Sequence, residues 1–191
     1  MTTILLIRHA EKPDGEYQGV NELGVNDAES LIPQGWQRAG ALVVFFAGQS
    51  GLPIPDQIYV SAPDKEKVAP HVKIGSKSNR PIETVTPLAA KLNKTPIQTF
   101  SKGDEADLVD AIVKLDGTSL VCWQHESIPQ IAELIMGSSA GIPSPWPPGR
   151  FDVVWTFTRD DAGKPWIFGQ VCQRLLSGDG LNPIAQSDSL H

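Results

Sequence analysis

Short apolar runs alternate with amphipathic segments along the first two thirds of the chain. Uninterrupted apolar runs are typical of strands that are covered on both faces of a parallel sheet. The sequence has three of them, at residues 3–7 (TILLI), 57–60 (QIYV) and 118–123 (TSLVCW). The segments that follow them repeat apolar positions at helical spacing, and a proline often stands at their start. We therefore expect helices at 33–46, 81–92, 105–115 and 129–136.

The last third of the chain has a different pattern. Residues 152–158 and 166–175 alternate between apolar and polar positions around a turn rich in Asp and Gly, which predicts a β-hairpin. A further short strand is expected at 96–100. The whole pattern predicts a three-layer α/β/α sandwich with a mainly parallel sheet and an antiparallel hairpin at its edge. We expect one domain over residues 1–176 and a loose, polar C-terminal tail over 177–191.

The charge and composition of the chain argue against nucleic acid and membranes as binding partners. The chain of 191 residues has 16 basic and 22 acidic side chains, which give a formal net charge of −6. Binding to nucleic acid or to an anionic membrane needs a basic surface, so we expect neither. No apolar run is long enough to span a membrane, and Arg8 interrupts the apolar start of the chain. We expect a cytoplasmic protein, and the pattern indicates no particular oligomeric state.

The number of cysteines and the spacing of the histidines and carboxylates do not predict a metal site. The sequence has two cysteines, Cys122 and Cys172, each inside an apolar segment. We expect two reduced thiols, because they are too few for a thiolate zinc site. No other His or carboxylate cluster has metal-ligand spacing, so we expect no metal and no cofactor.

Two of the four histidines directly follow predicted strands. His9 comes after the first strand, and His125 comes after the strand at 118–123. Ligands in such sheets bind beyond the carboxyl ends of the strands, so we expect both imidazoles at one site. A neutral imidazole can attack phosphorus when cations neutralise the phosphoryl oxygens, and Arg8 stands beside His9. Arginine suits this task because its planar fork binds two oxygens at once.

Four segments resemble, in order, the motifs of the histidine phosphatase (phosphoglycerate-mutase-like) superfamily. Residues 7–13 (IRHAEKP) resemble the nucleophile tripeptide and its surroundings, and residues 31–39 (LIPQGWQRA) resemble the start of the helix that follows. Residues 78–84 (SNRPIET) resemble the segment with the second arginine, and residues 121–125 (VCWQH) resemble the strand that delivers the second histidine. The resemblance covers about residues 3–137.

The resemblance implies a role for each matched residue. His9 would attack the substrate and carry the phosphoryl group, while Arg8, Arg80 and His125 would bind the phosphoryl oxygens. It implies a metal-independent phosphomonoesterase that acts on a phosphorylated small molecule through a phosphohistidine intermediate. Because arginines stand where other phosphatases use a cation, such an enzyme needs no metal.

The position of Arg80 departs from the family pattern. In many relatives the second arginine follows the preceding strand closely, whereas here the lysine-rich segment 61–79 intervenes. No other arginine lies between Arg38 and Arg150, so Arg80 is retained. A solvated loop is the simpler interpretation of this segment, but four of its lysines could attract an anion: Lys65, Lys67, Lys73 and Lys77.

The proton donor for the leaving group has several candidates. A general acid speeds the loss of an alkoxide by about 10²–10⁴-fold. Glu126 is adjacent to His125 and matches the acidic position of the phytase and acid-phosphatase branch, so it is the first candidate. Glu83 and Glu11 are the alternatives.

Two other functions could use the same residues. A phosphoglycerate-type mutase shares the core, but such relatives have an Arg and a Tyr before the second histidine, and residues 93–117 contain neither. A catalytically weak relative that binds a phosphorylated ligand or a protein partner is the third hypothesis. The complete set of two arginines and two histidines favours an enzyme.

Overall fold

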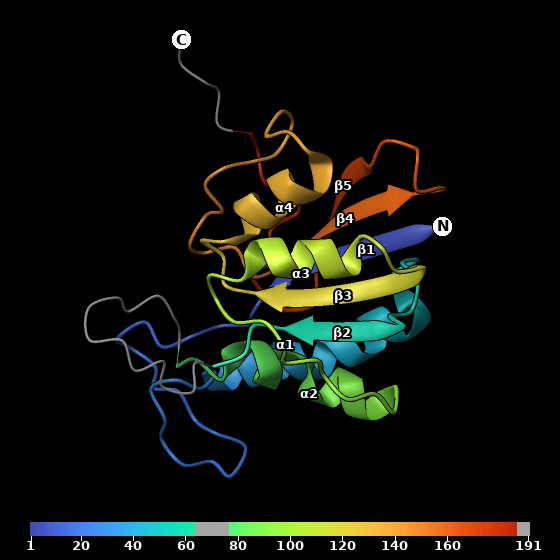
Figure 1. Ribbon diagram of the computed structural model, residues 1–191. Helices are drawn as coiled ribbons and strands as arrows, with labels where there is room; N and C mark the ends of the chain where they lie inside the picture. Colours follow the sequence, from blue (N-terminus) through green and yellow to red (C-terminus); the bar gives the residue numbers. More distant parts are fainter. Residues whose placement is uncertain (64–76, 187–191) are drawn as a thin grey trace, which may run out of the picture.

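The computed structural model describes residues 1–63 and 77–186, and a five-stranded mixed sheet forms its centre. The strand order is β2-β3-β1-β4-β5 (Figure 1). Strands β1, β2 and β3 are parallel, and β4 and β5 form an antiparallel hairpin on the other side of β1. Their bounds are β1 Thr2–Arg8, β2 Gln57–Val60, β3 Gly117–Trp123, β4 Val153–Arg159 and β5 Ile167–Cys172.

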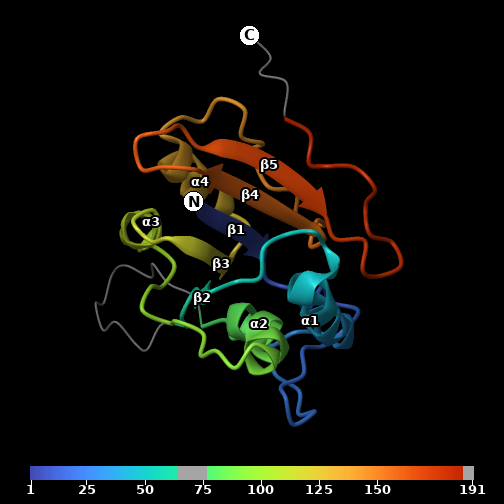
Figure 2. The ribbon, with the colours of Figure 1, turned by 90° about the vertical axis from the view of Figure 1, so that its right-hand side faces the viewer.

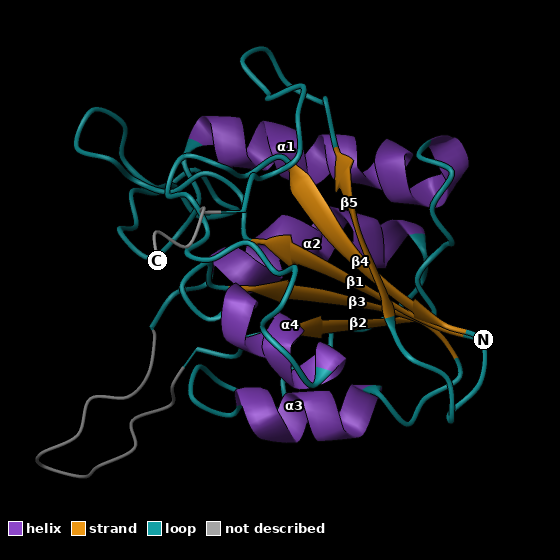
Figure 3. Cartoon of the chain, turned by 90° about the horizontal axis from the view of Figure 1, so that it is seen from above, coloured by secondary structure: helices purple, strands orange, loops and turns teal. Residues whose placement is uncertain are grey.

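Helices cover both faces of this sheet. Viewed along the layers, α1 and α2 lie on one face, and α3 and α4 lie on the other (Figures 2 and 3). The helices are α1 Pro33–Val44, which continues into the π-helical turn η1 Phe45–Gln49, then α2 Arg80–Lys91, α3 Glu105–Ile112 and α4 Ile128–Met136. The predicted three-layer α/β/α sandwich with its C-terminal hairpin is confirmed.

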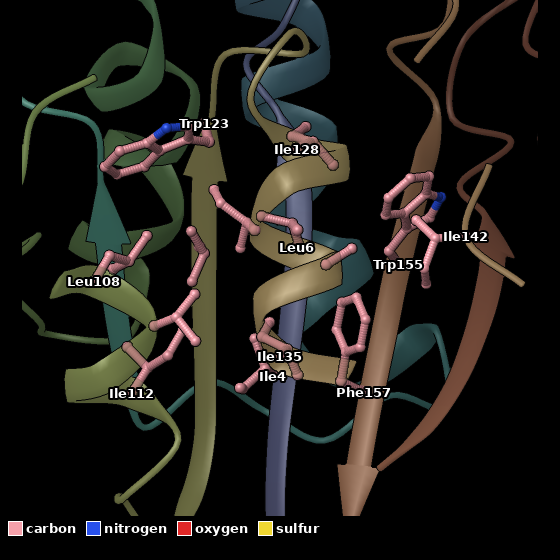
Figure 4. Packing of buried hydrophobic residues seen from close by; sticks show 14 of the residues in the cluster. Ile4, Leu6, Leu108, Ile112, Trp123, Ile128, Ile135, Ile142, Trp155 and Phe157 are labelled. Atoms are coloured by element: carbon pink, nitrogen blue, oxygen red, sulfur yellow. The ribbon is translucent and has the colours of Figure 1, made fainter. Parts of the chain in front are cut away.

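Successive side chains of β1 point to opposite faces of the sheet, and both faces are buried, so the apolar run of this strand is uninterrupted. Ile4 and Leu6 point toward α3 and α4, where they pack with residues of both helices and of β4 (Figure 4). Leu5 and Ile7 point the other way, into the cluster beneath α1 and α2. Burying an aliphatic side chain of this size contributes roughly 1.5–3 kcal/mol, so both faces hold the central strand in place. Its carboxyl end is therefore a rigid platform.

The strand expected at 96–100 is not formed. Only isolated bridges pair this segment with the region of β2, between Tyr59 and Ile97 and between Ala62 and Ser101. Pro96 has no backbone N–H with which to continue a ladder, so the pairing stays local.

The segment 177–186 is not the loose tail that the sequence predicts. Asp179 forms a buried ion pair with Arg38, and Ile184 is buried in the core. The side chain of Gln170 also bonds both backbone groups of Ile184. Partners provided by distant parts of the chain thus hold this segment, and the packed unit extends to Ile184; residues 187–191 lie outside the described residues.

Three further expectations concern the surface and the thiols. No helix in the described ranges is long and apolar enough to cross a membrane. Cys122 and Cys172 are both free thiols. Of the loop lysines, Lys77 is exposed, whereas Lys65, Lys67 and Lys73 lie outside the described residues.

Candidate active site

The ends of β1 and β3 bring the two predicted histidines to the same edge of the sheet. Arg8 pairs in register with Trp123, and the N–H of His9 donates to the Trp123 carbonyl at 3.1 Å. His9 and His125 therefore leave two adjacent parallel strands on the same side. Burial of the imidazole lowers the pKa of His125, and the positive charge of Arg8 contributes to this shift.

The N-terminus of α2 is bonded directly to the backbone beside His9. The N–H of Ala10 donates to the Thr84 hydroxyl at 2.8 Å, and this hydroxyl donates to the Arg80 carbonyl at 2.7 Å. On the α1 side, Gly35 lies so close to Glu11 that a Cβ on it would stand 2.6 Å from the Glu11 carbonyl oxygen. Both helices thus fix the turn that follows His9.

The imidazole of His9 is buried, oriented and neutral. Its Nδ1 lies 2.7 Å from the Ala10 carbonyl oxygen, which only accepts, so Nδ1 carries the hydrogen. No group of the described residues bonds Nε2, whose lone pair is left available. Burial lowers the pKa of His9 to about 3; the bond to Ala10 opposes this shift, and the charges of Arg8 and Arg80 add to it. The ring is therefore an unprotonated nucleophile at neutral pH.

Arg8 is buried with one edge of its guanidinium unpaired. The residue is 1% exposed, and Nη1 donates to the carbonyls of Pro148 and Arg150. Nε and Nη2 are buried and have no hydrogen-bond partner among the described residues. Burial lowers the pKa of Arg8 to about 10, so it remains a cation at neutral pH. Buried donors without a partner are rare, and the geometry of this edge of a guanidinium matches two oxygens of an anion.

Glu126, the first candidate for the proton donor, is ionised at neutral pH. Its carboxylate accepts a hydrogen bond from Lys102 and lies 2.9 Å from Nδ1 of His125. Burial by itself would raise the pKa of Glu126, but Lys102 and His125 lower it to about 2. In this arrangement Glu126 is an acceptor and holds no proton for a leaving group.

Both alternative acids are engaged elsewhere. Glu83 accepts from the Ser30 hydroxyl at 2.6 Å and from the Leu31 N–H at 2.9 Å, and burial raises its pKa. Glu11 accepts three bonds from Arg38: its Oε1 accepts from Nε and Nη2 at 3.0 and 2.7 Å, and its Oε2 accepts from Nε at 3.1 Å. Both oxygens of each carboxylate accept hydrogen bonds, so these side chains join neighbouring segments of the chain.

Arg80 lies at the site with part of its guanidinium already bonded. Nε donates to the Ser30 carbonyl at 3.3 Å, Nη1 donates to the Ser78 hydroxyl at 3.1 Å, and Nη2 donates to the carbonyl of Ala28. Its charge nevertheless reaches the His9 ring and helps to lower the pKa of that ring. Arg80 thus contributes positive charge from the α2 side.

Two residues of the site were not singled out from the sequence. The ammonium of Lys12 helps to lower the pKa of both His9 and His125, so it lies near both rings. Lys12 could have been recognised as a candidate because it belongs to the segment 7–13, which resembles the nucleophile motif. Phe151 stacks on Arg8, with the guanidinium carbon 3.8 Å from the ring centroid, and no local pattern indicated this contact.

Two cavities flank these residues. A cavity of about 410 Å³ has His125 and Glu126 at its wall, and the indole of Trp146 from the Pro-rich loop lines it as well. A second cavity, of about 540 Å³, is lined by Lys12 and Phe151 among others. Within the described ranges, no group of three or more His, Cys, Asp or Glu side chains could hold a metal ion.

The fold is shared with solved phosphatases. No family model and no curated protein matches the chain. The protein histidine phosphatase SixA, solved with tungstate, is 14% identical with a TM-score of 0.57, over 90% of this chain and 97% of that one. The phosphoserine phosphatase of Entamoeba histolytica, solved with 3-phosphoglyceric acid, is 17% identical with a TM-score of 0.53, over 92% and 100%. YhfR of Bacillus stearothermophilus is 14% identical with a TM-score of 0.54, over 93% and 98%. The chain has the histidine phosphatase fold.

Proposed function

We propose that this chain is a metal-independent phosphomonoesterase of the histidine phosphatase superfamily, with His9 as its nucleophile. The observation that carries the proposal is that two groups occur together: a neutral imidazole and a buried arginine. Among the described residues, nothing bonds Nε2 of the imidazole or the two-donor edge of the arginine. Such a pair suits a tetrahedral oxyanion. The likeness in fold to SixA, which was solved with the oxyanion tungstate, supports this assignment.

The reaction has two steps on one nitrogen. Nε2 of His9 attacks phosphorus and forms an N–P bond while the bond from phosphorus to the ester oxygen breaks, and the leaving group departs with the electron pair as an oxyanion that takes up a proton from solvent. Water then attacks the phosphohistidine, the N–P bond breaks, the electron pair returns to Nε2, and phosphate leaves together with a proton. Because the imidazole already carries its hydrogen on Nδ1, it needs no base to become nucleophilic.

Cations around His9 compensate the charge of the phosphoryl group. The Nε–Nη2 edge of Arg8 would bind two of its oxygens, Lys12 and Arg80 would add positive charge, and the His125 ring would complete the anion site. Donors that are already in place act without reorganisation and are worth most where water is excluded. This local cluster lets a chain of net charge −6 bind an anion.

The leaving group would lie in the cavity beside His125. Glu126 at its wall would donate a proton only in the small protonated fraction that its lowered pKa allows, or after substrate has displaced Lys102. Esters whose leaving groups depart without protonation should therefore react fastest. An aryl phosphate is such an ester.

Hydrolysis of p-nitrophenyl phosphate in EDTA, combined with trapping of the phosphoenzyme, tests the proposal. We expect turnover in the wild type, and an acid-labile, alkali-stable phosphoryl adduct on His9. His9→Asn keeps a donor for the Ala10 carbonyl but cannot attack, so it should lose both signals. Binding of phosphate without turnover would favour the weak relative, and interconversion of 3- and 2-phosphoglycerate would favour the mutase. Turnover that survives in His9→Asn would overturn the assignment.

A further inference from the structure

The guanidinium of Arg8 is held on one face by an aromatic ring rather than by a carboxylate. Its central carbon lies 3.8 Å from the centroid of Phe151, and no carboxylate of the described residues lies within ion-pair distance of it. The same ring lies 6.3 Å from the His9 imidazole, tilted by 53°. Phe151 thus contacts the cation beside the nucleophile and also faces the nucleophile itself.

The backbone on both sides of Phe151 is anchored. The Arg150 carbonyl accepts from the Trp146 indole at 2.8 Å, and the Arg150 side chain donates to Asp152 at 2.7 Å. Asp152 is 3% exposed, and its carbonyl accepts from the Gln173 N–H at 2.7 Å. The ring therefore stands on a fixed segment and not on a free loop.

A ring face can hold an arginine without occupying its donors. A carboxylate would also orient Arg8, but it would take the two-donor edge and neutralise the charge that the phosphoryl group needs. The π-face of Phe151 attracts the cation from above its plane and leaves every N–H free. Nη1 is tied to the carbonyls of Pro148 and Arg150, so within the described ranges the Nε–Nη2 edge is the part of the guanidinium that remains open.

We propose that Phe151 is a positioning residue of the phosphoryl site, whose ring fixes the plane of Arg8 so that the Nε–Nη2 edge faces the bound anion. This inference rests on the proposed function. Phe151 does not touch the reacting atoms in this role. It acts through Arg8, and it reduces the reorganisation that binding of the anion requires.

Affinity for inorganic phosphate, measured by calorimetry, tests this role together with KM and kcat for p-nitrophenyl phosphate. Phe151→Leu keeps an apolar side chain but removes the ring, and we expect it to raise the Kd of phosphate roughly 5- to 30-fold. Phe151→Tyr keeps the ring and should remain within about 2-fold of the wild type. In an Arg8→Met background, Phe151→Leu should have no further effect on Kd, because the two residues act as one unit.

Two further variants separate positioning from packing. Phe168→Leu removes a ring that packs on Trp155 at 5.4 Å and makes no contact with Arg8, so it should lower Tm without changing the Kd of phosphate. Pentafluorophenylalanine at position 151 keeps the shape of the ring but reverses its charge distribution. It should therefore raise the Kd of phosphate as Phe151→Leu does. This second variant decides the matter even if Phe151→Leu fails to fold.

The outcomes distinguish this inference from the function on which it rests. A wild-type protein that neither binds phosphate nor turns over the ester would overturn the proposed function and this inference with it. A wild-type protein that is active, while Phe151→Leu and the fluorinated variant bind phosphate normally, would overturn the role of Phe151 alone.

Discussion

Two buried arginines contact or belong to the segment from Arg8 to Glu11, and their surroundings are opposite. Arg38 is 2% exposed, and it gives all three of its nitrogens to the side chains of Glu11, Gln173 and Asp179. Arg8 is 1% exposed, and it has two backbone carbonyls and an aromatic ring as its partners. One guanidinium is fully paired, and the other keeps an open edge.

The pKa values of the two side chains follow from this difference. Burial by itself lowers the pKa of either cation, yet the carboxylates of Asp179 and Glu11 raise the pKa of Arg38 above its usual value. Arg8 has no such partner, so burial lowers its pKa to about 10. A buried cation with every donor satisfied holds a structure together, whereas one with unpaired donors is prepared for an anion.

The largest effect on stability should come from Arg38. Arg38→Met leaves the buried carboxylates of Glu11 and Asp179 without a counter-charge, and we expect a loss of about 3–5 kcal/mol of unfolding free energy. Urea denaturation measures it. Arg38→Lys keeps the charge but not the two-pronged geometry and should lose less. A stable Arg38→Met variant would show that the ion pairs contribute little.

Arg8 should show the reverse behaviour. Arg8→Met removes a desolvated cation that forms no ion pair among the described residues, and the charges of Glu126 and Glu11 offset its burial only in part. We therefore expect an unfolding free energy within about 1 kcal/mol of the wild type. Its kcat for p-nitrophenyl phosphate should fall about 10²–10³-fold, because donors to the transition-state oxygens are lost. Arg159→Met is the matched control, since Arg159 stacks on Trp166 at the far end of β1. Normal turnover in Arg8→Met would remove Arg8 from the site.

Acid should destabilise the protein partly through His9. The pKa of His9 is about 3 in the folded chain, against an ordinary value near 6.5, so the unfolded chain binds more protons between these values. The contribution is complete above about pH 6.5 and is lost as the pH falls, by on the order of 1–2 kcal/mol down to pH 5. Denaturation of wild type and His9→Asn across this range measures it, and equal pH dependence of the two would contradict the burial of a neutral ring.

Phosphate should stabilise the fold mainly through Arg8. At a phosphate concentration ten times its Kd, the unfolding free energy should rise by about 1.4 kcal/mol in the wild type. Arg8→Met should show a much smaller gain at the same concentration, whereas Arg38→Lys should keep it. The shift in the urea midpoint measures this effect, and a gain retained in Arg8→Met would place the anion elsewhere.

The sequence predicts the parts of this molecule that local pattern controls. The buried strands at 3–7 and 118–123 have apolar runs that only a sheet covered on both sides explains. His9 and His125 stand directly after these strands, so their approach follows from the parallel pairing of β1 and β3. The N-terminus of α2, with Arg80, was found by its motif.

Contacts between distant segments could not be predicted in this way. Phe151 reaches Arg8 across more than 140 positions, and Arg38 finds Asp179 across 141, so no spacing rule connects them. Asp179 lies in a polar segment whose sequence is typical of a loose tail, and nothing local indicates that Asp179 pairs with the buried Arg38. The ion pair of Glu126 with Lys102 could not be predicted either, because Lys102 lies in the loop before α3 and Glu126 lies in the turn after β3.

NMR observation of the arginine Nε–H groups during phosphate titration tests the comparison most directly. In the wild type, the Nε–H resonance of Arg8, assigned by its absence in Arg8→Met, should move strongly as phosphate binds, because this donor gains its first acceptor. The Nε–H of Arg38 should stay where it is, since Glu11 already occupies it. Movement of the Arg38 signal, or an Arg8 signal that saturating phosphate leaves unchanged, would contradict the account of an open anion site beside His9.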